Sequence, residues 1–189
     1  MYNSLSALPK ASYNILQYLA LNNETIWKML KYNSYDALHK PNLTMGEKMD
    51  LIWKTGPQEN FGVFFTNLIE EEICESKCVL KIYSYYIHAN PSAYLSTPVF
   101  AFDFLYGGKM SLVDKDGYPV NRGDLFIHEI LKTLNGANIG GVGKMQFNDD
   151  LSRYTAARSI IGNSKTFTGV TIYLSTLMGD NGEEVSCGD

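Results

Sequence analysis

Three cysteines and three histidines are the side chains of this 189-residue chain best suited to metal binding or nucleophilic catalysis. Cys74 and Cys78 have three residues between them, whereas the usual zinc and redox pairs have two. No second cysteine or histidine pair follows at a spacing that completes a tetrahedral site, and Cys187 stands alone near the end. We therefore expect reduced thiols, without a metal or another cofactor.

The histidines form no complete catalytic motif. His128-Glu129 begins a zinc-protease pattern whose second histidine would stand at position 132, where the chain has Lys132. His88 lies near Cys78 in the sequence, so a small intracellular hydrolase that uses His88 with a nearby cysteine or aspartate remains an alternative. Apart from that alternative, the sequence predicts that the protein is not an enzyme.

A glycine-rich stretch, residues 136–144, invites comparison with the phosphate-binding loop GxxxxGK[ST]. Counting back from Gly143-Lys144, the first glycine of that motif falls at Asn138, and Met145 replaces the hydroxyl residue that would hold magnesium. The stretch also follows a helical pattern and enters a strand pattern, which reverses the context of the motif. We interpret it as a flexible linker between a helix and a strand.

The properties of the whole chain predict a soluble, intracellular protein with an ordinary globular core. The formal net charge is -4, which gives the surface as a whole no attraction for nucleic acid or anionic membranes. The apolar runs, such as 99–106, are far shorter than the roughly 20 residues of a membrane-spanning helix. Because polar residues interrupt the segment after Met1, we expect no signal peptide there.

Residues 1–66 have the periodicity of helices. Ser12 is a suitable N-cap for a first helix, which Asn22 should interrupt. Thr44 and Glu47 match a capping box that opens a later helix.

Around residue 78 the apolar period changes to the alternation of β-strands. One helix interrupts the strands; Asp124 should cap its start and Asn135-Gly136 its end. The segments expected to be strands are 78–88, 99–106, 109–114, 142–147 and 167–178. No strand–helix–strand repeat occurs, so we predict an α+β fold with a mostly antiparallel sheet of about five strands packed by helices.

This pattern also predicts the domain organisation. The expected parts are a helical N-terminal region over 1–66, an α+β sheet domain over 67–178 with an extended arm at 148–166, and a disordered acidic tail over 179–189.

Aromatic residues are frequent, with 13 Tyr and 9 Phe, and occur on both faces of the expected strands. Strict alternation puts Tyr83 and Tyr85 on one face and Tyr86 on the other. Because an antiparallel sheet normally has one wet face, this pattern indicates that helices or another subunit cover the second face. Asp103 suggests that its face is partly wet or is an interface. A larger core with a floppy loop at 148–166 stays open as the alternative.

Tyrosine is favoured at protein interfaces, and polar arms gain order from neighbours. The residues that we expect at such contacts are Tyr94, Arg153, Tyr154, Arg158 and Asp103. No catalytic, cofactor-binding or metal-binding residue is predicted.

Three stretches carry a resemblance to a known class of protein: VFAFDFLYGG at 99–108, RGDLFIHEIL at 122–131 and FTGVTIYL at 167–174. With this order of helices, strands, helix and closing strands, the chain resembles phage neck and tail proteins of the tail-terminator or tail-completion (head–tail connector) type. The resemblance implies a structural virion subunit, assembled in the host cytoplasm, that forms a ring and joins the portal or neck to the tail.

The resemblance also implies the partners. They are further copies of the chain in a ring homo-oligomer, portal, adaptor or tail-tube proteins, and the DNA that passes through the channel, without membrane contact. A monomeric protein-binding module is the other alternative to this interpretation.

Overall fold

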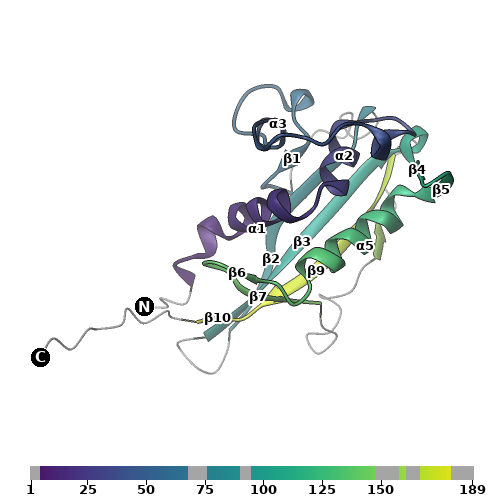
Figure 1. The fold of residues 1–189 in the computed structure, drawn as a ribbon. Coiled ribbons are helices and arrows are strands. Elements are labelled where there is room, and N and C mark those ends of the chain that lie inside the picture. Colours follow the sequence, from purple (N-terminus) through teal and green to yellow (C-terminus); the bar gives the residue numbers. More distant parts are fainter. Residues whose placement is uncertain (1–4, 68–75, 90–94, 148–157, 161–166, 180–189) are drawn as a thin grey trace, which may run out of the picture.

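A long sheet and a layer of helices on one side of it make up the fold (Figure 1). The structure is a computed structural model that describes residues 5–67, 76–89, 95–147, 158–160 and 167–179. The helices are α1 (Leu8–Asn22), α2 (Thr25–Lys31), α3 (Met45–Asp50) and α5 (Arg122–Leu134), with short 3-10 turns η2 (Ala37–His39), η3 (Gln58–Asn60) and η4 (Gly108–Met110). The strands are β1 (Val63–Phe64), β2 (Val79–Ala89), β3 (Leu95–Gly107), β4 (Leu112–Lys115), β5 (Tyr118–Asn121), β6 (Asn138–Ile139), β7 (Gly143–Gln146), β8 (Arg158–Ile160), β9 (Phe167–Thr176) and β10 (Met178–Gly179).

The main sheet has eight strands, with the order β1-β2-β3-β9-β7-β6; β10 also pairs with β3, and β8 pairs with β9. Its pairs are antiparallel except for β1 and β2. The expected α+β class with a mostly antiparallel sheet is confirmed. The sheet exceeds the expected five strands because β1, β6, β8 and β10 have only two or three residues, too few to show alternation in the sequence.

Two helices begin at residues other than the expected ones. Helix α1 begins at Leu8 after Ala7, with a proline in its first turn, so Ser12 lies inside the helix and is not its cap. Helix α5 is capped by Asn121, whose side-chain oxygen accepts hydrogen bonds from the backbone N–H of Gly123 at 2.9 Å and of Asp124 at 3.1 Å. Asp124 is therefore in the first turn, where its charge still favours the helix dipole.

The capping box at the start of α3 is confirmed. The Thr44 hydroxyl accepts from the Glu47 N–H at 3.3 Å, and the Glu47 carboxylate accepts from the Thr44 N–H at 2.9 Å. The stop of α1 at Asn22 is confirmed as well. The short strand β1, in contrast, lies inside the segment that was expected to be helical throughout.

The segment after β3 leaves the main sheet. The turn η4 directs β4 away, and β4 pairs with β5 in a separate two-stranded sheet instead of with β3. The connecting turn, Asp116-Gly117, has positive φ angles of 56° and 86°, which match the right-handed twist of a two-residue hairpin. Figure 1 shows this hairpin at one end of α5 and the β6–β7 hairpin at the other.

The hydrophobic core lies between the helices and one face of the sheet. Phe100, Phe102 and Phe104 alternate along β3 on this face and are fully buried. Phe104 stacks on Phe126 of α5, with ring centroids 4.5 Å apart and an interplanar angle of 8°. Residues of α1, α2 and α5 belong to the same core, so the N-terminal helices pack directly on the sheet.

A buried arginine ties the start of α5 to the end of α2. The Arg122 side chain is fully buried, and its guanidinium donates to the carbonyl oxygens of Met29 at 3.0 Å and Ser34 at 2.8 Å. It lies 3.4 Å from the Tyr32 carbonyl oxygen and 3.2 Å from the Cys78 sulfur. The cation is therefore balanced by carbonyl dipoles at and beyond the C-terminal end of α2.

Candidate functional site

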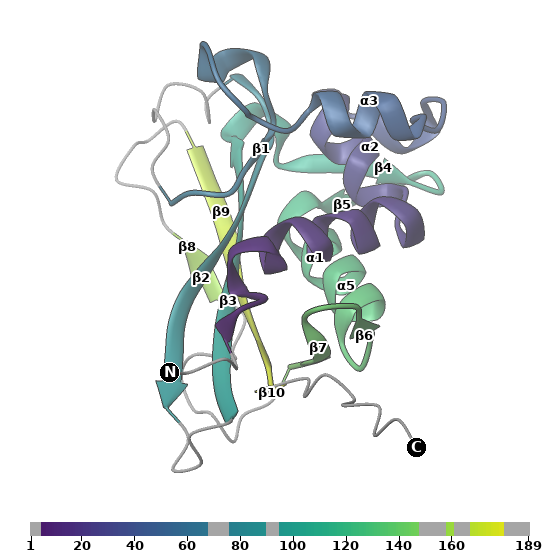
Figure 2. The ribbon, with the colours of Figure 1, turned by 90° about the vertical axis from the view of Figure 1, so that its left-hand side faces the viewer.

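The second face of the sheet, which points away from α1, α2 and α5, is the most distinctive surface of the molecule (Figure 2). Val99 and Ala101 of β3 lie on this face and form a small cluster with Tyr173 and Tyr83. A second cluster at the β1 end contains Phe64 and other residues. The helices on the first side take no part in these two clusters.

A row of polar residues crosses the middle of this face. In register, Lys81 of β2 pairs with Asp103 of β3, Asp103 pairs with Thr171 of β9, and Thr171 pairs with Arg158 of β8. The Lys81 ammonium lies 3.1 Å from one Asp103 carboxylate oxygen, and the Thr171 hydroxyl donates to the other at 2.7 Å. The backbone register therefore places Asp103 and Arg158, two residues expected at contacts, on either side of Thr171.

Asp103 differs from the wet or exposed residue that the sequence suggested. It is 4% exposed, and Lys81, Thr171 and Tyr83 all give it partners within the subunit. A buried carboxylate is tolerated only with such compensation, so these partners explain how a charge can occupy an otherwise apolar strand. Its expected role at an interface stays a prediction.

Tyr83 connects the polar row to the tyrosines beside it. Its hydroxyl donates to the Asp103 carboxylate at 3.1 Å. Burial raises the pKa of Tyr83 above its ordinary value, and the neighbouring Asp103 charge raises it further. The phenol therefore stays a neutral donor at any physiological pH.

A β-bulge places three tyrosines on the same face. The register between β2 and β3 shifts between Ser84 and Tyr86, so the strict alternation expected for Tyr83, Tyr85 and Tyr86 is wrong. Tyr86 pairs with Val99 of the second face, and the Tyr85 ring lies 4.9 Å from the Tyr173 ring.

We call the four residues Tyr83, Tyr85, Tyr86 and Tyr173 the tyrosine face. Tyr173 is buried and Tyr83 half-buried, whereas Tyr85 is 43% and Tyr86 45% exposed. The tyrosine face thus has an anchored base and an accessible outer part. This arrangement suits a protein contact, because tyrosine presents a large, rigid surface with a polar tip.

The remaining expected contact residues fall largely beyond the described part of the chain. Tyr94, Arg153 and Tyr154 lie outside the described residues, as does most of the 148–166 arm. Arg158 begins β8, and for this strand the structure describes the backbone pairing with β9. The acidic tail from residue 180 onwards also lies outside the described residues.

Cys78 and His88, the alternative catalytic pair, lie near opposite ends of β2. Cys78 directly precedes β2 and His88 lies near its end, so ten residues of extended chain, roughly 33 Å, lie between them. Cys78 is fully buried, and burial raises the pKa of its thiol to about 11 despite the nearby Arg122. This thiol is therefore inert, and it has no contact with His88.

The zinc-protease candidate His128-Glu129 does not form a catalytic site in the structure. His128 is on the surface of α5, and the adjacent Glu129 is buried and accepts a hydrogen bond from Asn23 at 2.9 Å. Among the described residues, no three His, Cys, Asp or Glu side chains gather as a metal site would require. None of the described helices is long and apolar enough to cross a membrane.

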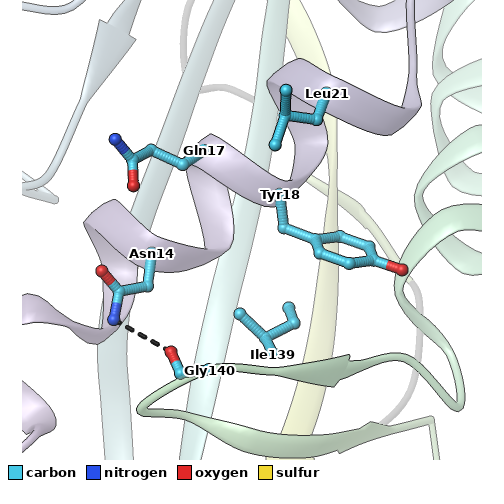
Figure 3. A pocket seen from close by; sticks show the side chains of 6 residues that line it. All are labelled: Asn14, Gln17, Tyr18, Leu21, Ile139 and Gly140. Atoms are coloured by element: carbon cyan, nitrogen blue, oxygen red, sulfur yellow. Dashed lines mark hydrogen bonds between the residues drawn. The ribbon is translucent and has the colours of Figure 1, made fainter.

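The glycine-rich stretch is an ordered hairpin and not the flexible linker that we expected. Strands β6 and β7 pair within it, and the Asn14 side chain of α1 donates to the Gly140 carbonyl oxygen at 3.1 Å. The hairpin and α1 enclose a shallow pocket of about 280 Å³, shown in Figure 3. Its lining residues are Asn14, Gln17, Tyr18, Leu21, Ile139 and Gly140.

Fold and surface together define an α+β protein with helices on one sheet face and a tyrosine-bearing surface on the other. The chain belongs to the YomW family, whose model matches residues 23–176. This is a phage-type family, in agreement with the phage origin that the resemblance implied. No curated protein and no solved structure matches the chain.

Proposed function

We propose that this protein is a structural virion component, a ring-forming subunit of the tail-terminator, tail-completion or head–tail connector type. The ring joins the portal or neck to the tail, and its partners are further copies of the chain and neighbouring portal, adaptor or tail-tube proteins. Membership of a phage-type family supports the phage part of this proposal. The tyrosine face supports the assembly part.

The tyrosine face supports an assembly role because two of its rings are accessible while the others are held in place by contacts within the subunit. Tyr85 rests on Tyr173, and Tyr83 is held by Asp103 of the polar row. Immobilised aromatic side chains lose little further entropy when a partner covers them, which favours tight contacts. The position of these rings on one face follows from the β-bulge, a device that re-aims side chains in many sheets.

The tyrosine face is too small to supply a whole subunit contact by itself. A tyrosine buries roughly 150–250 Å² at most, whereas permanent subunit contacts bury on the order of 2,000 Å² or more. Two half-exposed rings therefore supply a fraction of one contact. A ring subunit needs at least one further surface for its next copy.

The experiment that tests the function measures incorporation into particles. Phage particles from cells that produce this protein are purified, and the copies per particle are counted by quantitative mass spectrometry. Electron microscopy of the particles and of the purified protein then shows whether rings form. We expect a fixed, small copy number and a ring of one size. A protein that is abundant in the lysate but absent from purified particles contradicts the proposal.

A matched pair of variants links the result to the tyrosine face. The double substitution Tyr85→Ser and Tyr86→Ser removes both accessible rings and should reduce incorporation strongly. The control is Met45→Ser, because Met45 is also 43% exposed but lies on α3 in the helical layer. Both variants should keep the circular dichroism spectrum of the parent. Equal incorporation of the two variants contradicts the role of the tyrosine face.

A further inference from the structure

An exposed tyrosine stands out beside the turn of the β4–β5 hairpin, which is separate from the main sheet. Tyr118 is 72% exposed beside the turn, and Leu112 is half exposed at the far end of β4. Single exposed apolar residues are common, but a large aromatic ring at the tip of a projecting hairpin is well placed to enter a hollow. No residue of the described chain covers it.

The hairpin is held in place although it has only two strands. Val113 is buried in the main core, and the Asp114 N–H donates to the Tyr35 carbonyl oxygen at 2.7 Å. The Asp114 carboxylate accepts from the Gly117 N–H at 2.9 Å and lies 3.3 Å from the His39 ring. Tyr118 is thus presented on a pre-organised support, which lowers the entropic cost of docking.

A hollow lies at the opposite end of α5. The hairpin β4–β5 ends where α5 begins, whereas two residues of the pocket, Ile139 and Gly140, follow the end of α5. A helix of 13 residues spans roughly 20 Å, so the tip and the pocket of one chain cannot meet. Figure 1 shows the two hairpins at the two ends of this helix.

The pocket has the walls and polar groups that a tyrosine side chain requires. Leu21, which is 73% exposed, and the half-buried Tyr18 offer apolar surface above the buried Ile139, and the Gln17 carboxamide oxygen can accept from a phenol (Figure 3). The glycine at position 140 leaves open space, since a Cβ built there meets no atom within 4 Å. An aromatic ring can therefore lie over the hairpin backbone.

Charges around the two surfaces are complementary. Lys10 lies one helical turn before Asn14, and Lys144 pairs with Asn138 next to the pocket. Asp116 stands in the turn two residues before Tyr118 and is the exposed charge there, whereas the adjacent Lys115, which pairs with Tyr118, is half-buried. Lys10, Lys144 and Asp116 are all exposed, and none of the three has an ion pair within the described part of the chain.

We propose that Tyr118 of one copy inserts into the α1/β6–β7 pocket of the next copy, with Asp116 facing Lys10 and Lys144. The inference rests on the proposed function, because it names the contact that joins neighbouring subunits of the ring. Two different surfaces at opposite ends of a subunit make a head-to-tail contact, which closes into a ring when the rotation permits it. The tyrosine face is then left for the neighbouring virion protein.

The first test is a disulfide between two differently tagged populations. One carries Tyr118→Cys and the other Leu21→Cys, both in a background with Cys74→Ser and Cys187→Ser. After mixing under mild oxidation, we expect the mixed dimer to exceed either same-tag dimer on a non-reducing gel. The control replaces Leu21→Cys by Tyr86→Cys, because Tyr86 is exposed at 45% on the sheet face that points away from α1. Equal yields with the control contradict the proposal.

The second test reverses the charges. Asp116→Lys alone should weaken self-association by about tenfold or more, and adding Lys144→Asp should restore part of it. Failure of the double variant to recover contradicts the contact. If rings form and particles contain the protein but neither test responds, the contact is wrong while the proposed function stands. If the protein is monomeric at all concentrations and absent from particles, both the contact and the proposed function are wrong.

Discussion

Replacement of the buried Arg122 by methionine should destabilise the protein strongly. The guanidinium makes two short hydrogen bonds to backbone carbonyls, at 3.0 Å to Met29 and 2.8 Å to Ser34, and two longer contacts. A hydrogen bond to a charged group contributes about 1.5–3 kcal/mol, so two of them amount to about 3–6 kcal/mol. Removal of the cation also relieves its desolvation, which offsets part of this loss. We therefore expect a decrease of about 3 kcal/mol in the free energy of unfolding, within a typical total of about 5–15 kcal/mol.

Urea unfolding followed by tryptophan fluorescence measures this change, since Trp27 is fully buried near the affected helices. Arg122→Lys should fall between the parent and Arg122→Met, because one ammonium cannot reach both carbonyls with the geometry of a guanidinium fork. Lys109→Met, at an exposed cation, serves as the control and should change stability by less than about 0.5 kcal/mol. A loss below about 1 kcal/mol for Arg122→Met refutes the reasoning, since the two carbonyls would then have found other partners.

Three further predictions concern the sheet. Asp103→Ala leaves the largely covered Lys81 side chain, which is 12% exposed, without its carboxylate and should cost about 3 kcal/mol in urea unfolding, whereas a loss under about 1 kcal/mol contradicts the pairing. Gly169→Ala should prevent normal folding, because a Cβ there overlaps a carbonyl oxygen of β3, while Gly140→Ala, where space is open, should leave the melting temperature nearly unchanged. Cys78 should resist iodoacetamide at pH 8 in the folded protein and react only in urea, as peptide mass spectrometry can show. Burial raises the pKa of the Cys78 thiol from 9.0 to about 11. The stabilisation of the folded state by the neutral buried thiol is therefore complete below pH 9.0 and is lost as the pH rises toward about 11.

The local elements of the fold could be predicted from the sequence because their signals are local. The capping box at Thr44, the long alternating segments that became β2, β3 and β9, and the glycine stop after α5 depend on neighbouring residues only. The short strands could not be predicted, because two or three residues pair only where the rest of the sheet places a partner beside them.

The candidate surface was partly predictable. The number of tyrosines and the apolar character of both strand faces indicated that helices or another subunit cover the second face, but alternation alone assigned Tyr85 and Tyr86 to opposite faces. The β-bulge that brings them together depends on the register between β2 and β3, which is set by contacts across the sheet. The pocket lined by Asn14 and Gly140 also depends on the placement of the glycine-rich hairpin against α1.

The sequence by itself therefore determined the α+β class and the aromatic character of the sheet, since propensity and period are properties of short segments. Tertiary structure alone decided that Arg122 is buried, that Asp103 is fully paired within the subunit and that the tyrosines share one face. Each of these outcomes involves residues from distant parts of the chain, such as Arg122 and Met29 or Asp103 and Thr171. Such pairs form because burial makes an uncompensated polar group costly, and that cost exists only once the chain has folded.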